Sequence, residues 1–221
     1  MAPVRITATS GSITVTAEAR DDVTVDRGQH HPMGGVLEVK GTSSGVVMRV
    51  PIGTDIIVGT TSGAVTLYGK FGELRVAGRS GRVEIEECAS VDVRTVSGRV
   101  VIGVVSGECR IKTASGRIRV TRAGGELNVA TVSGRIDVGD VAGAVRVNTV
   151  SGTVSLGMSQ AADARADSVS GRVTIELPHG VHPRTSLVSV NGRCECELTE
   201  GDDCRVTGRT VSGRIAIRER R

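Results

Sequence analysis

A short sequence pattern returns at nearly constant spacing, and this repeat constrains the fold more than any other feature of the chain. The dipeptide Ser-Gly, followed by one variable and one apolar residue, recurs about every 18 residues. It occurs at Ser62-Gly63, Ser80-Gly81, Ser97-Gly98, Ser115-Gly116, Ser133-Gly134, Ser151-Gly152, Ser170-Gly171 and Ser212-Gly213, with Asn191-Gly192 in its place once. Related Gly turns lie halfway between, so the smallest unit is about nine residues long. Self-similarity at a fixed period predicts a repeat architecture.

The apolar residues of each half-unit indicate short strands. They occupy relative positions 1, 3 and 6, as in Val100, Ile102 and Val105. Alternation at the first two of these positions is typical of a strand with one buried face. A helix needs a period near 3.6, and a Gly at every ninth residue would cost it about 1 kcal/mol each.

Half-units of about nine residues leave no room for crossover helices, which need a dozen or more residues. An antiparallel meander would place too many strands in one open sheet, since such sheets seldom exceed about ten strands. A coiled chain in which each repeat lies directly on the preceding one satisfies the pattern, because each coil buries the Val and Ile of its neighbours. Only Tyr68 and Phe71 are aromatic, and 30 residues are Gly, which suits a narrow interior with tight corners. We predict an all-β fold, a single parallel β-solenoid of about 18 residues per coil.

The first part of the chain departs from the repeat. Residues 1–47 hold three alternating stretches, Val4–Thr9, Ile13–Ala17 and Val23–Val25, followed by a polar segment, Asp26–Gly35, which we expect to be a loop. A bare terminal coil would offer an unpaired edge to other chains. We therefore predict an irregular N-terminal β cap over residues 1–47 and one continuous solenoid over residues 48–221.

Charge and composition narrow the class of protein. The net charge of +4 arises from 28 basic and 24 acidic residues, which indicates a soluble chain and only weak attraction to anionic surfaces. No stretch is long and apolar enough for a transmembrane helix, and the N-terminus lacks the pattern of a signal peptide. Five cysteines without framework spacing favour reduced thiols. We expect a cytoplasmic protein, with peripheral association with the envelope as the alternative.

The variable residue after Ser-Gly is frequently arginine. We call these residues the arginine row: Arg82, Arg99, Arg117, Arg135, Arg172, Arg193 and Arg214. Stacked coils would align them along one edge, where guanidinium groups could hold phosphate, lipid headgroups or an acidic partner. The competing interpretation is a set of solvated turn residues balanced by the neighbouring Glu84, Asp137 and Glu195. No aromatic residues accompany the row, so we expect no nucleic-acid binding.

A second ladder consists of hydroxyls, because Thr or Ser stands two residues before most of the repeated serines, as in Thr131, Thr149 and Ser168. Such a grid is similar to the surface of ice-binding solenoids. Side-by-side hydroxyls also stabilise sheets by about 0.2–1 kcal/mol each. We interpret the ladder as structural.

The remaining chemistry-bearing residues give no catalytic or metal site. Cys88, Cys109, Cys194 and Cys196 have inward parity and are predicted to be small core residues, while no cysteine pair has metal-ligand spacing. His179 and His182 lie in a Pro-flanked loop and are expected to be exposed. No triad, nucleophile elbow, phosphate-binding loop or dinucleotide fingerprint occurs. We predict no enzymatic activity, no cofactor and no metal.

Several segments carry a family resemblance. Val46–Thr54, followed by Thr60–Gly69, resembles the opening of the bacterial "putative adhesin", or toastrack, family of β-strand repeat proteins. Thr149–Val154 and Val169–Pro178, with the following Gly180, are similar to the same family's repeat and Leu-Pro-x-Gly loop. The resemblance covers roughly residues 36–217. It implies a β-solenoid and a loose association with cell-surface adhesion or envelope-stress systems, and it supplies no catalytic residues.

Two functional hypotheses follow from the repeat and from the lack of a recognisable site. The first is a non-enzymatic scaffold or binding module that presents repetitive faces to a protein partner or to another copy of itself. The alternative is a cell-surface adhesion or envelope-stress element acting at the membrane.

Overall fold

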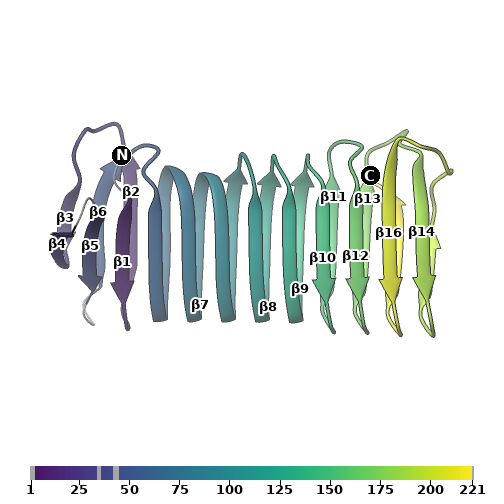
Figure 1. The fold of residues 1–221 in the computed structure, drawn as a ribbon, viewed down its shortest axis with the longest axis horizontal. Helices are drawn as coiled ribbons and strands as arrows, with labels where there is room; N and C mark the ends of the chain where they lie inside the picture. Colours follow the sequence, from purple (N-terminus) through teal and green to yellow (C-terminus); the bar gives the residue numbers. More distant parts are fainter. Residues whose placement is uncertain (1–2, 34–35, 42–44, 221) are drawn as a thin grey trace. The chain divides into compact units, whose positions relative to one another are not determined.

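The computed structural model describes residues 3–33, 36–41 and 45–220, and these residues contain strands and turns but no helix (Figure 1). They form two compact units, residues 1–106 and residues 107–221.

The strands of unit 1 are β1 (Val4–Ala8), β2 (Ile13–Glu18), β3 (Thr24–Arg27), β4 (Gln29–Met33), β5 (Val36–Gly41), β6 (Val46–Pro51) and β7 (Ile56–Val105). The strands of unit 2 are β8 (Cys109–Ala123), β9 (Leu127–Val141), β10 (Val145–Thr149), β11 (Thr153–Met158), β12 (Ala164–Ser168), β13 (Arg172–Leu177), β14 (Pro183–Ser189), β15 (Arg193–Cys196), β16 (Cys204–Thr210) and β17 (Arg214–Glu219). The longest of these ribbons, β7, β8 and β9, run through corners of the coil without interruption.

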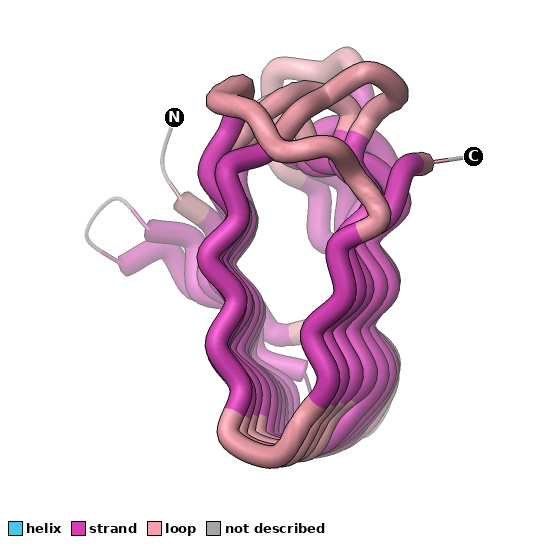
Figure 2. Tube along the Cα trace, turned by 90° about the vertical axis from the view of Figure 1, so that its right-hand side faces the viewer, coloured by secondary structure: helices cyan, strands magenta, loops and turns pink. Residues whose placement is uncertain are grey.

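The predicted parallel solenoid is confirmed in the strand pairing. In unit 2, Cys109 pairs with Leu127 and Leu127 pairs with Val145, in parallel and about one repeat apart. In unit 1, β1 and β2 pair in parallel with β7. Figure 2 shows the coil of unit 2 as two facing zigzag strands, with a tight corner at one edge and longer loops at the other.

Coil order departs from chain order near both ends of the chain. In unit 1 the coil β1–β2 lies between β5–β6 and β7. In unit 2 the coil β16–β17 lies between β12–β13 and β14–β15. The expectation that each repeat lies directly on the preceding one is therefore wrong at these places. The first coil, β1–β2, and the last coil, β16–β17, therefore each have a neighbouring coil on both sides, which pairs their backbone N–H and C=O groups.

The N-terminal segment contains both parallel and antiparallel strands. β1 and β2 are parts of a coil, whereas β3 pairs antiparallel with β6 and β4 pairs antiparallel with β5. The prediction of a loop over Asp26–Gly35 is wrong for all of its described residues except Gly28, because Asp26 and Arg27 end β3 and Gln29–Met33 is β4, which pairs with the outer side of β5. Gly34 and Gly35 lie outside the described residues. The predicted domain boundary at residue 47 stays a prediction.

The interior is aliphatic, and the inward positions alternate as expected. Phe71 is buried, and the other aromatic residue, Tyr68, is half exposed. In unit 2 the inward residues of β9, Leu127, Val129, Ile136 and Val138, are at most 2% exposed. The core therefore lies between the two facing sheets, and the edges carry whatever chemistry the unit offers.

Candidate functional site

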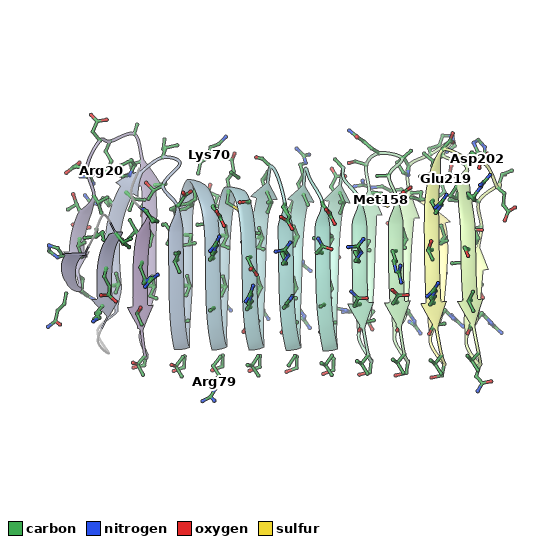
Figure 3. All side chains as sticks on the ribbon, viewed as in Figure 1. Arg20, Lys70, Arg79, Met158, Asp202 and Glu219 are labelled. Atoms are coloured by element: carbon green, nitrogen blue, oxygen red, sulfur yellow. The ribbon has the colours of Figure 1, made fainter. Side chains whose placement is uncertain are left out.

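The corners that contain Ser-Gly form one edge of each unit, which we call the corner edge. Figure 3 shows side chains projecting there, with Arg79 of unit 1 labelled. In unit 2 the stacked corner glycines leave no space for a side chain, because a Cβ on Gly171 or Gly213 would run into the backbone carbonyl of the next glycine in the stack. The repeated Gly is therefore required by the close approach of neighbouring coils.

Buried hydroxyls fasten several of these corners. The N–H of Gly152 donates to Thr149 Oγ1 at 3.0 Å, and the N–H of Gly171 donates to Ser168 Oγ at 2.9 Å. Ser189 and Thr210 accept the equivalent bonds from Gly192 and Gly213. Thr149 and Ser168 are only 5% and 7% exposed, so these hydroxyls face the interior and not the solvent. The structural interpretation of the hydroxyl ladder agrees with this geometry.

The strand register determines which members of the arginine row are neighbours. Arg82 and Arg99 belong to unit 1, and the other five belong to unit 2. In unit 2, Arg117 pairs with Arg135, and Arg135 pairs with Thr153, which interrupts the row. Beyond it the stacking order is Arg172, Arg214, Arg193, since β17 lies between β13 and β15. Three arginines thus follow each other at about the 4.8 Å strand spacing.

Only part of the row is balanced by acidic side chains. Arg82 lies 3.5 Å from Glu84, and Arg193 lies 3.6 Å from Glu195, as the competing interpretation expected. Asp137 instead contacts Arg119, at 3.4 Å. Within the described residues, the five remaining members make no ion pair: Arg99, Arg117, Arg135, Arg172 and Arg214. All five are exposed, so their charges are available to solutes.

A groove of about 680 Å³ runs along the corner edge of unit 2. It is lined by four stacked triplets, 151–153, 170–172, 191–193 and 212–214. Its cations are Arg172, Arg193 and Arg214, and its other walls are Ser, Asn, Thr and Gly. The corner backbone is already occupied: Ser170 and Arg172 donate their N–H groups to the adjacent coil. The groove therefore offers guanidinium groups and hydroxyls.

Beside this groove lies an apolar feature that the sequence analysis did not identify. We call it the valine ridge: Val132, Val150, Val169, Val190 and Val211. Its members are 44–72% exposed, and each stands immediately before the Ser or Asn of a corner. The parity of the strand was a usable signal, because Val147 and Thr149 both point inward and Val150 must then point outward. The aligned valines form an exposed apolar stripe beside the groove.

The opposite edge, which carries the loops, is fixed by charge. Arg220 Nη1 lies 3.1 Å from Asp140 Oδ1, and Arg122 Nε lies 3.5 Å from Asp140 Oδ2. Burial works to raise the pKa of Asp140. The hydrogen bonds from Arg220 and Ser159 and the charges of Arg220 and Arg122 outweigh it, so the pKa lies below its ordinary value. In Figure 3, Asp202 and Glu219 are labelled at this edge.

The cysteines only partly follow the prediction. Cys88 and Cys109 are buried, and burial, together with the charge of Glu87, raises the pKa of Cys88 to about 12. Cys194 and Cys196 have the predicted inward register, opposite Ile215 and Ile217, yet Cys194 is half-buried and Cys196 is exposed. Their assignment to the core is therefore wrong, because they belong to a coil beyond which the described residues form no further coil.

His179 and His182 are exposed, as expected; they contact Glu219 and Asp203 respectively. Within the described residues, no group of three His, Cys, Asp or Glu side chains could hold a metal ion. The same part of the chain contains no helix long and apolar enough to cross a membrane.

The fold and its corner edge define an all-β protein of the parallel solenoid class. The family model of Toastrack DUF4097 matches residues 18–217, and the chain belongs to that family. The family predicted from Val46–Thr54 and the repeats is thereby confirmed.

Two solved structures are similar to the chain. One is a "putative cell adhesion protein" from Clostridium sporogenes, with 9% identity, 99% of this chain and 93% of that chain covered, and a TM-score of 0.29. The other is a "putative adhesin" from Bacteroides fragilis, with 11% identity, 96% and 91% covered, and a TM-score of 0.30. A comparison with curated proteins finds no match.

Proposed function

We propose that the protein is a non-enzymatic binding module whose contact surface is the corner edge of unit 2. The observation that carries the proposal is the joining of two features on one edge. Arg172, Arg214 and Arg193 stack in a groove, and the valine ridge lies directly beside them. An extended protein segment that carries both acidic and apolar side chains complements such a surface.

Electrostatics support a ligand of this kind. Arg172 and Arg214 make no ion pair within the described residues, so binding a carboxylate there breaks no existing pair. Arginine donates bidentate hydrogen bonds to carboxylates, and three arginines at strand spacing favour a ligand with regularly placed acids. The groove is long and open, which suits an extended chain more than a compact metabolite.

The test uses a fluorescent peptide of about ten residues with alternating Glu and Val, an extended probe of the stated chemistry. We expect binding that weakens with salt and that is lost in the triple variant Arg172→Glu, Arg193→Glu, Arg214→Glu. The matched control replaces three arginines on the other sheet of unit 2 by Glu: Arg146, Arg165 and Arg205. This variant should bind the peptide as the wild type does. Equal loss in both variants, or no binding by the wild type, refutes the proposal.

A parallel measurement separates this function from the membrane alternative. Vesicles that contain phosphatidylglycerol present phosphate without a polypeptide. Binding to these vesicles with no binding of the Glu–Val peptide would replace the proposed protein partner with a lipid surface. Replacing Val150, Val169 and Val211 by Ser should weaken peptide binding without abolishing it, because the arginines remain.

A further inference from the structure

The outermost coil of unit 2, β14–β15, has neighbours on one side only. β14 pairs with β16, and β15 pairs with β17. Within the described residues, no strand pairs with their other sides, whereas β16 and β17 each have two partners. Figure 2 looks at unit 2 from this end. A row of backbone N–H and C=O groups therefore faces outward, ready to pair with another strand.

The inward side chains of this coil are correspondingly uncovered. Cys194 and Cys196 pair in register with Ile215 and Ile217, which are fully buried. Cys196 is exposed, and Leu187, whose neighbour in the sheet is Gly208, is only half-buried. At this end of unit 2, the apolar and thiol side chains that face the interior are therefore partly exposed to solvent.

Two protections of an exposed edge, lysine and a proline inside the strand, are missing from this coil, although Arg184, Arg193 and Glu195 carry charge on its outward faces. Neither β14 nor β15 contains lysine, and Pro183 stands at the first residue of β14, where it does not block pairing. The neighbouring loops cross beyond the ends of the strands (Figure 2). The loop after β15 is tied there by Gly201 N–H, which donates to Pro183 O at 3.2 Å. In unit 1, by contrast, β3 and β4 pair with the outer sides of β6 and β5.

Paired with itself, the segment Arg193–Glu197 brings opposite charges together at both of its ends. Two copies that meet through the same end are related by a two-fold axis, which makes the paired strands antiparallel. An axis through Glu195 places Arg193 of each copy opposite Glu197 of the other, which also contacts Arg218 of its own chain at 3.3 Å. The two Glu195 carboxylates then face each other, each with Arg193 of its own chain at 3.6 Å to offset the repulsion. The same axis places Cys194 opposite Cys196, so that inward residues meet inward residues.

The same axis is compatible with β14. Ser189 and Arg193 stand on the two sides of one corner. Leu187 and Glu195 are each two residues farther from that corner, so they lie at the same level of the coil. Leu187 then pairs with its own copy, and the open interiors of the two solenoids become continuous. The contact buries the apolar groups that are exposed in the single chain.

We propose that the β14–β15 edge is a docking surface for a second copy of this chain, which adds its own β14–β15 coil in antiparallel register. The interface combines strand pairing, burial of Leu187 and the thiols, and two Arg193–Glu197 ion pairs. This inference shares Arg193 with the proposed peptide groove, but sedimentation tests it without any ligand, so its failure is distinguishable from failure of the proposed function.

Sedimentation equilibrium of the reduced full chain tests the proposal directly. We expect a reversible dimer at about 100 µM chain that dissociates on dilution. Leu187→Lys places a charge on the inward side of the edge and should give a monomer. Val188→Lys, on the outward side of the same strand, is the matched control and should remain dimeric. A wild type that stays monomeric, or a dimer unchanged by Leu187→Lys, overturns the proposal.

Exchanging the two charges of the proposed ion pair distinguishes loss of the dimer contact from unfolding of the variant. Glu197→Arg should weaken the dimer by about tenfold, and adding Arg193→Glu should restore it, because the opposite charges then meet again. Mild oxidation of the wild type should also yield a disulfide between Cys194 of one copy and Cys196 of the other. Failure of the double variant to recover, or a monomeric chain that binds only a foreign extended peptide, contradicts the pairing.

Discussion

Eight of the nine repeated corners take one of two forms, which differ in how the backbone turns; the ninth, at Gly134, has neither a positive φ nor a hydrogen bond to Thr131. At Gly63, Gly81, Gly98 and Gly116 the glycine has a positive φ between 138° and 153°. At Gly152, Gly171, Gly192 and Gly213 φ is not positive, and a side-chain hydroxyl three residues earlier accepts the glycine N–H. We call the first form the open corner and the second the clipped corner.

The threonine changes its role between the two forms. At open corners Thr95 and Thr113 donate to the carbonyls of Ser97 and Ser115, each at 3.2 Å. At the clipped corner of Gly152 the threonine accepts instead. The same Thr-x-Ser-Gly letters thus support two backbone solutions, and the close stacking of coils is the demand common to both. The two forms should therefore lose different amounts of stability when the glycine or the hydroxyl is replaced, and the glycine should matter most.

Replacing a corner glycine by alanine should harm the open form more. Gly98→Ala adds a Cβ that meets the backbone carbonyl of Gly81 and also forces alanine to a φ of 144°. Gly152→Ala meets Gly134 O and Thr149 Oγ1, each at 2.8 Å, without a positive φ. Crowding costs about 1–3 kcal/mol in either case. The strained φ adds about 1–3 kcal/mol at Gly98.

Urea titration of each variant measures the loss of unfolding free energy. Alkylation of Cys88 reports the unfolding of unit 1, and alkylation of Cys109 reports the unfolding of unit 2. Both thiols are buried, so each reports the opening of its own unit. Equal losses of unfolding free energy would show that φ contributes nothing beyond crowding.

The hydroxyl clip can be tested with two threonines that are equally buried, at 5% exposure. Thr149→Val leaves the N–H of Gly152 without its acceptor and should cost about 1–3 kcal/mol. Thr131 Oγ1 has no hydrogen-bond partner within the described residues, so Thr131→Val should be neutral or stabilising. A comparable loss of unfolding free energy in both variants would argue against the clip.

At an open corner the hydroxyl should matter less than the clip. Thr113→Val removes a donor from the carbonyl of Ser115, an exposed residue that water reaches. We expect a loss of about 0.5–1 kcal/mol, smaller than that of Thr149→Val. Urea titration of the two variants side by side checks the order, and the reverse order would contradict it.

The loop edge, which is held by charge and not by glycine, should give the smallest and most pH-dependent effect. The lowered pKa of Asp140 means that its carboxylate stabilises the fold above the pKa of the unfolded chain, and that this contribution is lost as the pH falls through the folded pKa. Arg220→Gln should therefore lower the thermal midpoint at pH 7, with a difference from the wild type that narrows toward pH 3. A difference independent of pH would place the effect of Arg220 outside this ion pair.

Much of this fold could be predicted because each repeated residue type has a structural role that follows from its chemistry. The spacing of Ser-Gly and the alternation in Val145 and Val147 determine strands, register and burial together. The clip could not be predicted, because Thr113 and Thr149 occur in the same motif, Thr-x-Ser-Gly, and differ only in the geometry of the backbone around them. Coil order near the chain ends also escaped prediction, because β14 and β16 are similar and either could pair with β12. The exposure of Cys196 and the adjacency of Arg172 to Arg214 follow from that order.

Coil order in unit 2 is the claim on which both the groove and the docking edge depend, and paired cysteines measure it most directly. In a background whose native cysteines are replaced by Ala or Ser, Arg172→Cys with Arg214→Cys should form a disulfide on mild oxidation, because these residues are in register on adjacent strands. Arg172→Cys with Arg193→Cys should not, since β17 separates them. A disulfide between positions 172 and 193, with none between 172 and 214, would contradict the account.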